Sequence, residues 1–369
     1  MLPEEITKAQ RLVRTDAYQM SIGEIVSMYE SDEIIIDPEF QRLFRWNISQ
    51  KSKLIESLLL GIPLPSIFVF EKEDGKWELI DGLQRLSTIL EFMGQLKSPT
   101  GGREPPSVLE GTKYLPSLHN VVWDISDQIS GALPDKQVPL NKASQLAIRR
   151  ARLSVEILKR PSDNQTKFDL FQRLNAGGTQ ANSQELRNCI MLMVNVTYFR
   201  SVKTAAEAPD FSTVIDVSDE ARERQRHLEM AVRFLVYTKI SYDGTLDVEA
   251  YIDEGIVTLA AAGNDVVDVK LIGDTFHLLM EAAGGDALRR FENNRHLGKV
   301  GLVGLEGIAV GVAKNLPAIL ATPDPKTFVR ERIQSFWGQS EIAEFTSPGL
   351  RGTARIQKTL PFGARWFRP

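Results

Sequence analysis

The sequence has few of the residues that build disulfide frameworks and metal clusters. Its four histidines are scattered along the chain: His119, His227, His277 and His296. Cys189 is the only cysteine among 369 residues, which excludes an intramolecular disulfide framework and a zinc site made of clustered cysteines. Because Cys189 lies in an apolar run, we expect a buried thiol rather than a reactive one.

Long apolar runs are also missing, and we expect no leader sequence. The most apolar late stretch, 302–320, is interrupted by Glu306, Lys314 and Pro317, whereas a spanning helix needs about 20 mostly apolar residues. The N-terminus lacks the basic start and apolar core of a signal peptide. We therefore expect a cytoplasmic protein with no membrane segment.

The net charge and the glycine pattern limit the possible classes of function further. A net charge of −4 is small, so any basic surface for nucleic acid must be local. Neither G-x-x-x-x-G-K-[ST] nor G-x-G-x-x-G occurs, which excludes a P-loop NTPase. Glycines recur at three- and four-residue intervals at Gly301, Gly304, Gly307 and Gly311. We interpret this spacing as a sign that helices pack closely there.

The first third of the chain mixes strand and helix signals. Short apolar or β-branched runs predict three strands, at 34–36, 67–70 and 77–80. Apolar residues at helical spacing predict two helices, at 50–60 and 86–93. Asp74 and Gly75 predict a hairpin turn between the last two strands, and Gly61 ends the first helix.

The later sequence becomes mostly helical. A loop-rich stretch at 97–116 and one more strand candidate at 153–158 precede this change. We predict an α+β fold with two domains, 1–190 and a mostly α-helical 191–369 that ends in a basic tail.

The most specific motif is LIDGLQRLST at 79–88. A strand leads through Asp81 and Gly82 into a helix, whose first-turn amides lack intrahelical partners and can bind an anion. Gly82 allows close backbone approach to a ligand, and Arg85 adds a charged fork that matches phosphate oxygens. Gln84 can donate to a base, a sugar or a water, and Asp81 can hold a magnesium ion.

The same residues also fit a purely structural connection. Asp81 is then an ordinary cap and Arg85 a surface charge. Short motifs have many false positives, so the local chemistry alone favours this second interpretation.

Two further clusters leave the same alternatives open. DPEFQRLFRW at 37–46 joins Gln41 and Arg42 to three aromatics. Arginine beside an aromatic ring can stack on a base while it contacts phosphate, although core packing explains the aromatics. FDLFQRLNAGG at 168–178 places Arg173 and Asn175 at a helix end, where a C-cap is sufficient, or at the rim of the same pocket.

Along the chain, the three motifs are P-x-x-Q-R with a following Trp, then D-G-x-Q-R, and then F-x-R-L-N-x-G-G with Q-E-L-R. Together and in this order, they resemble the GmrSD N-terminal-type family over approximately residues 20–190. The resemblance implies a ParB- and sulfiredoxin-like fold, with a small mixed sheet and helices, and a nucleotide site around a DGQQR loop.

The resemblance also assigns residues by position. Asp81, Gln84 and Arg85 would be catalytic, with magnesium at Asp81. The residues that would bind the nucleotide are Gln41, Arg42, Gly82, Arg85, Arg173 and Asn175. Leu83 departs from the signature, because the family usually has glutamine there, and this weakens the expectation of hydrolysis more than that of binding. The HNH nuclease half of larger relatives has no counterpart here.

Two functions follow from these observations. The first is a nucleoside-triphosphate-binding protein of a restriction or anti-phage defence system. It would hydrolyse the nucleotide with magnesium, and the nucleotide state would be coupled to DNA or partner binding. The second is a non-enzymatic DNA-binding or regulatory protein that recruits or restrains a separately encoded nuclease or toxin. Five basic residues lie near the C-terminus: Arg351, Arg355, Lys358, Arg365 and Arg368. They could contact a nucleic-acid backbone. Alternatively, they form a tail that is solvated or that docks on a partner protein.

Overall fold

The computed structural model describes residues 14–36, 46–99, 101–129, 131–159, 183–223, 225–347 and 349–369. The chain divides into two compact units, Met1–Gln180 and Ala181–Pro369, and we describe each by itself. The first contains a mixed sheet with helices and the second is mostly helical, which confirms the predicted α+β fold class.

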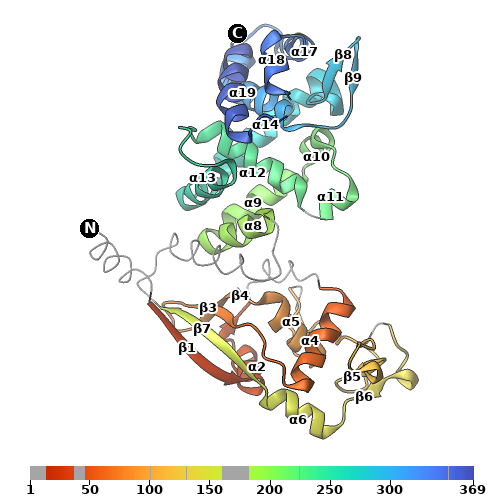
Figure 1. The fold of residues 1–369 in the computed structure, drawn as a ribbon. Coiled ribbons are helices and arrows are strands. Elements are labelled where there is room, and N and C mark those ends of the chain that lie inside the picture. Colours follow the sequence, from red (N-terminus) through yellow and green to blue (C-terminus); the bar gives the residue numbers. More distant parts are fainter. Residues whose placement is uncertain are drawn as a thin grey trace. The chain divides into compact units, whose positions relative to one another are not determined.

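The first unit is built on a five-stranded mixed sheet with the order β1-β7-β3-β4-β2 (Figure 1). Its strands are β1 (Arg14–Ser21), β2 (Ile34–Ile35), β3 (Ile67–Glu71), β4 (Trp77–Asp81) and β7 (Arg152–Lys159). The pairs β1–β7 and β3–β4 are antiparallel, whereas β3–β7 and β2–β4 are parallel. Strand β4, which leads into the DGLQR motif, therefore lies between β3 and β2.

Four helices lie on one side of this sheet (Figure 1). They are α2 (Ile22–Glu30), α4 (Ile48–Leu60), α5 (Leu83–Phe92) and α6 (Lys142–Arg150). In β7, the alternate side chains of Leu153, Val155 and Ile157 are buried. Successive side chains of a strand point to opposite faces, so these three line one face of the sheet and contribute to the core of the unit.

Local sequence signals set the elements next to the motif. Gly75 has a φ of 81° in the turn between β3 and β4, where the amide of Lys72 donates to the carbonyl of Lys76 at 2.8 Å. Helix α4 begins with a reciprocal capping box between Asn47 and Gln50, and it ends at Gly61 with a φ of 71°. The predicted hairpin and both predicted helices are confirmed.

Short elements occupy the connection between α5 and α6. They are η1 (Pro116–Leu118), β5 (Val121–Val122), η2 (Pro134–Lys136) and β6 (Val138–Pro139), and β5 pairs with β6 in parallel. Prolines begin both 3₁₀ turns, as expected for a residue with a fixed φ and no amide hydrogen.

The second unit packs helices of very different lengths around α12 and α14. Its first helices are α8 (Ser183–Val194), α9 (Val196–Glu207), α10 (Pro209–Ile215), α11 (Asp219–Glu223), α12 (Arg226–Lys239), α13 (Val248–Ala262) and α14 (Asp265–Ala283). The later elements are η3 (Gly284–Asp286), β8 (Arg290–Glu292), β9 (Arg295–Leu297), the π-helix η4 (Gly304–Ala309), α15 (Val310–Lys314), α16 (Leu316–Leu320), α17 (Pro325–Phe336), α18 (Ser340–Phe345) and α19 (Gly352–Trp366).

The regularly spaced glycines bring helices close together, as the sequence predicted for most of them. A Cβ on Gly307 would overlap the ring of Phe336, and one on Gly311 would lie 2.6 Å from the carbonyl oxygen of Gly363. A Cβ on Gly363 would in turn overlap the backbone of Gly307. Helix α19 therefore packs backbone to backbone on η4 and α15.

The second unit also contains a short hairpin between β8 and β9. Asn293 and Asn294 form its turn, with φ of 51° and 59°. Asparagine tolerates this left-handed backbone better than most residues. Among the described residues, no helix has the length and apolar composition needed to cross a bilayer.

Candidate functional site

The DGLQR turn links β4 to α5 through one glycine in a left-handed conformation. Gly82 has a φ of 94°, a region that L side chains rarely occupy. A Cβ at this position would also overlap the Cγ2 atom of Ile67 and lie 2.9 Å from its Cβ. The turn therefore requires glycine both for its backbone angle and for the close approach of β3.

The N-terminus of α5 lacks the side-chain cap that the other described α-helices of this unit have. Ser21, Asn47 and Asn141 each accept a hydrogen bond from the first turn of α2, α4 and α6. Gly82 has no side-chain oxygen, and no side-chain cap bond occurs at α5. The positive end of the α5 dipole is therefore not neutralised by its cap residue, as in helix termini that bind anions.

Arg85 holds the turn against the segment that precedes β3. Its Nη1 donates to the carbonyl oxygens of Pro65 and Ser66 at 2.6 and 2.9 Å. Its Nη2 pairs with the Asp81 carboxylate at 2.9 Å. With three acceptors and a side chain that is only 14% exposed, the guanidinium has a structural role, and it also places a positive charge beside the turn.

Asp81 is the only one of the predicted site residues proposed to hold a metal. Its carboxylate accepts from Arg85 and remains 24% exposed. Among the described residues, no group of three or more His, Cys, Asp and Glu side chains comes together as a metal site would need. Magnesium is often held by one or two carboxylates and by phosphate oxygens, so Asp81 fits a magnesium ion that arrives with a nucleotide.

Gln84 connects two of the three sequence motifs. Its Oε1 accepts a hydrogen bond from the backbone amide of Trp46 at 3.1 Å, and Trp46 is the tryptophan that follows the P-x-x-Q-R motif. The preceding residue, Leu83, is only 7% exposed. The other predicted nucleotide-binding residues lie outside the described residues: Gln41, Arg42, Arg173 and Asn175.

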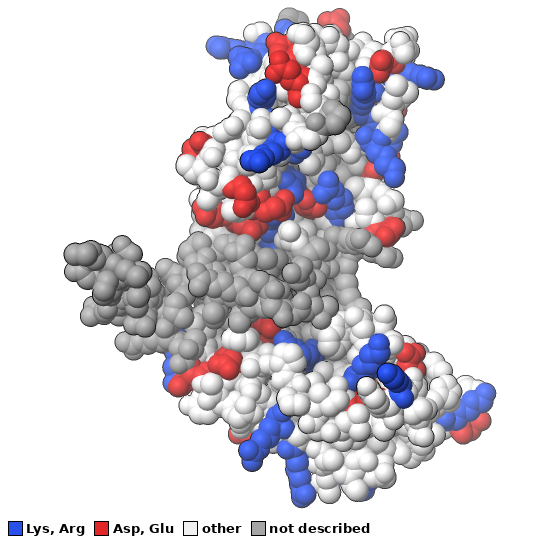
Figure 2. Space-filling model, viewed as in Figure 1, with Lys and Arg blue, Asp and Glu red and all other residues white. Residues whose placement is uncertain are grey.

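The five basic residues near the C-terminus belong to, or flank, helix α19. Arg355 makes an ion pair with Glu306, whose side chain is fully buried, and Lys358 pairs with Glu344 at 3.0 Å. The other three are exposed: Arg351, Arg365 and Arg368. On the face seen in Figure 2, acidic and basic side chains are interspersed on both units, without the single-sign patch that binds nucleic acid most strongly.

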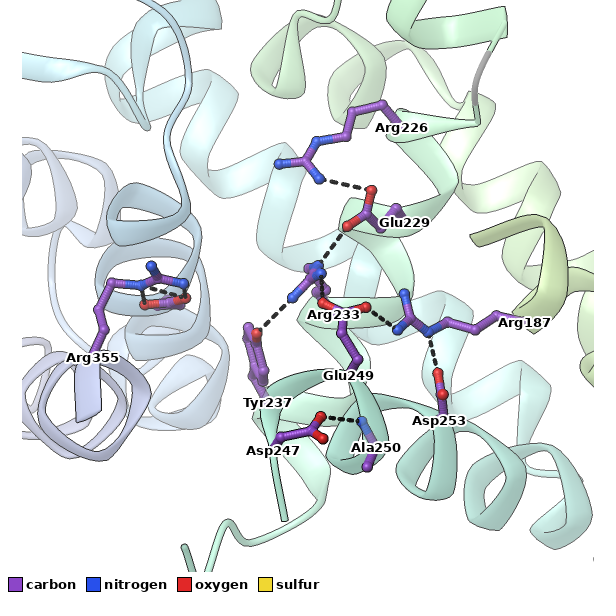
Figure 3. A network of polar contacts seen from close by, with 11 residues as sticks. Arg187, Arg226, Glu229, Arg233, Tyr237, Asp247, Glu249, Ala250, Asp253 and Arg355 are labelled. Atoms are coloured by element: carbon purple, nitrogen blue, oxygen red, sulfur yellow. Dashed lines mark hydrogen bonds and ion pairs between the residues drawn. The ribbon is translucent and has the colours of Figure 1, made fainter. Parts of the chain in front are cut away.

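A second polar cluster, which sequence reasoning missed, lies in the helical unit (Figure 3). Arg187 of α8 donates from Nε to Asp253 at 2.6 Å and from Nη2 to Glu249. Glu249 also accepts from Arg233 at 2.7 Å, and Glu229 accepts from both Arg233 and Arg226. The only sequence signal was the Q-E-L-R motif at 184–187, because its partners lie far away along the chain.

The arginines of this cluster keep two of its carboxylates ionised. Burial by itself raises the pKa of Glu229, but Arg233 and Arg226 hold that pKa below its usual value. Burial acts on Glu249 in the same way, and Arg187 and Arg233 lower the pKa of that carboxyl. For Asp253, burial prevails over Arg187 and raises the pKa.

The fold and the turn define an α+β domain with a strand–glycine–helix connection suited to an anion. Residues 22–192 match the model of a known family, the N-terminal domain of GmrSD restriction endonuclease. This segment is therefore similar to the GmrSD N-terminal domain, as the three motifs predicted. Neither the curated proteins nor the solved structures give a significant match to the chain.

Proposed function

We propose that the chain binds a nucleoside triphosphate at the DGLQR turn and acts in a restriction or anti-phage defence system. One observation carries this proposal: the α5 N-terminus, within the GmrSD-type segment, is preceded by a glycine and has no side-chain cap. Such a terminus offers amides and a positive dipole to phosphate oxygens. The family match supports the association with restriction.

Each residue of the turn has a defined part in this proposal. Gly82 keeps the backbone accessible, and Arg85 places its charge near the phosphates while it remains bound to Asp81. Asp81 holds the magnesium ion, which neutralises charge on the phosphate oxygens when it is bound. Gln84 joins the turn to the upstream motif through Trp46, so nucleotide binding at the turn and the position of that motif are linked.

The alternative function is nucleotide binding without hydrolysis, and Leu83 favours it. This apolar side chain is buried at the start of α5, so it offers no amide to position a water for hydrolysis. The chain would then bind a nucleotide without turnover, and would recruit or restrain a separately encoded nuclease or toxin. Both functions share the same binding site, and phosphate release distinguishes between them.

Contact with DNA is the finer part of the proposal. Arg355 and Lys358 are already paired with carboxylates, so the nucleic-acid contacts would come from Arg351, Arg365 and Arg368. Alanine at all three would weaken DNA binding and flatten its dependence on salt, since each lost phosphate contact reduces counterion release. An unchanged salt dependence would remove this surface from the proposal.

The experiment combines binding and turnover on the full chain. Affinity for each nucleoside triphosphate with magnesium is measured by calorimetry, and phosphate release is measured with and without DNA. Gln84→Ala should weaken nucleotide binding, whereas Gln128→Ala, an exposed glutamine of the same unit, should not. Binding without release would select the regulatory function, and equal affinity in the parent and Gln84→Ala would reject the site.

A further inference from the structure

The helical unit contains a cavity beside the arginine–carboxylate cluster. Its volume is about 400 Å³, within the range of small-molecule sites. It is lined by Ser183, Gln184, Ala221, Arg226, Glu229, Arg233 and Glu249. These residues come from α8, α11, α12 and α13, so four helices of one unit line this open cavity.

The carboxylates that line the cavity already have donors. Glu229 accepts from Arg233 at Oε1 and from Arg226 at Oε2, at 2.8 and 2.7 Å. Glu249 accepts from Arg233 at Oε1 and from Arg187 at Oε2. Each oxygen of these two carboxylates therefore has a guanidinium partner, and the two carboxylates have little capacity left to accept hydrogen bonds from a ligand.

One donor behind the cavity wall is buried without an acceptor. Arg187 does not itself line the cavity, but it donates to Glu249, which does. Its side chain has no exposed surface, and within the described part of the chain its Nη1 has no hydrogen-bond partner. Figure 3 shows this nitrogen on the side toward Arg226 and Glu229, away from Asp253, so a ligand that reaches it must displace the side chains in between. A buried N–H without an acceptor is costly, and a ligand oxygen would satisfy it.

Arg226 supplies a second donor at the mouth of the cavity. It binds Glu229 through Nη1, and its side chain is 39% exposed. A guanidinium has five N–H donors in a planar fork that matches carboxylate and phosphate oxygens. A ligand oxygen that enters between Arg226 and Arg187 would therefore meet donors from two helices.

We propose that this cavity binds a phosphate-bearing small molecule of nucleotide size, with the phosphate held between Arg226 and Arg187. The remaining donors require an acceptor-rich ligand, and the volume exceeds what a bare phosphate ion would fill. Glu229 and Glu249 are positioning residues, because they fix the guanidinium planes and do not themselves contact the ligand. This site is separate from the DGLQR turn and does not depend on the function proposed there.

The test uses the full chain with inorganic phosphate, a nucleoside 5′-monophosphate and the unphosphorylated nucleoside as probes. Calorimetry gives the affinity, and hydrogen–deuterium exchange locates the site. We expect the monophosphate to bind and the nucleoside not to bind, with slower exchange in α8 and in the first turns of α12. Arg226→Gln should weaken binding at least tenfold, because it removes the charged fork and leaves the Arg233–Glu229 pair intact.

Two control variants separate this site from others. Arg290→Gln changes an exposed arginine of the same unit, and Gln84→Ala changes the DGLQR turn, so neither should alter the protection of α8 and α12. A 5′-phosphorylated oligonucleotide, compared with its 5′-hydroxyl form, shows whether the phosphate can come from a nucleic-acid end. Absence of binding in the parent, or equal binding in Arg226→Gln, would overturn the proposal.

Discussion

The guanidinium of Arg355 is paired with the carboxylate of Glu306, which is fully buried beneath helix α19. Nε and Nη2 of the arginine both reach this carboxylate, at 3.0 to 3.2 Å, and Thr359 donates to its Oε2 at 3.1 Å. A residue that looks like part of a basic tail in the sequence is therefore the counter-charge of a buried acid.

Arg355→Ala should destabilise the helical unit strongly, because it leaves a buried carboxylate without its partner. A loss of about 3–5 kcal/mol is typical of such a change, measured by denaturant unfolding. Lys358→Ala is the matched control, since Lys358 and Glu344 are both well exposed and such pairs contribute little. Similar losses in the two variants would mean that the Arg355–Glu306 pair is unimportant for folding.

Gly82→Ala should destabilise the first unit more than Gly75→Ala. Both glycines have positive φ, so both substitutions cost about 1–2 kcal/mol for the backbone. Only Gly82 faces an obstacle, the side chain of Ile67, whereas nothing lies within 4 Å of a Cβ on Gly75. Thermal melting measures the difference, and overpacking of this kind adds about 1–3 kcal/mol.

Arg85→Ala should affect folding as well as nucleotide binding. The variant leaves the carbonyls of Pro65 and Ser66 and the carboxylate of Asp81 without their donor. Hydrogen bonds to charged groups contribute about 1.5–3 kcal/mol, so the melting temperature should fall even without nucleotide. Arg85→Lys keeps the charge and loses the fork. If its melting temperature equals that of the parent, the fork does not stabilise the turn.

The stability of the helical unit should fall in acid through Glu229 and Glu249. The pKa of each is lowered in the folded state, so their contribution is present above the unfolded pKa, about 4.3, and is lost as the pH falls through the folded pKa. Asp253, with a raised pKa, has the opposite dependence. The variant Glu229→Gln isolates the contribution of one carboxylate. Its melting temperature should fall less than that of the parent when the pH drops below about 4.

Local signals in the sequence were sufficient for the strand–turn–helix that carries the candidate site. The β3–β4 hairpin and α5 follow from the turn residues, the apolar runs and Gly82, all within a few positions of one another. Strand β1 was not predicted, because it lacks a regular apolar pattern and pairs with the distant β7.

The sequence could not predict side-chain roles that depend on contacts between residues far apart along the chain. The pairing of Arg355 with Glu306, and of Arg187 with Asp253, depends on helices brought together by the fold. Charge patterning along the chain identified the basic residues near the C-terminus but not their partners. The structural role of Arg85 was also hidden, since its acceptors are backbone carbonyls before β3.

Most of helix α8 lies within the segment that matches the GmrSD N-terminal domain, which ends at residue 192, yet this helix folds with the helical unit. The end of the matched segment and the end of the first folded unit are thus offset by about one helix. Arg187, in the matched segment, is neutralised by Asp253 and Glu249, which the segment does not contain. A break at residue 192 would therefore separate a buried cation from both of its counter-charges.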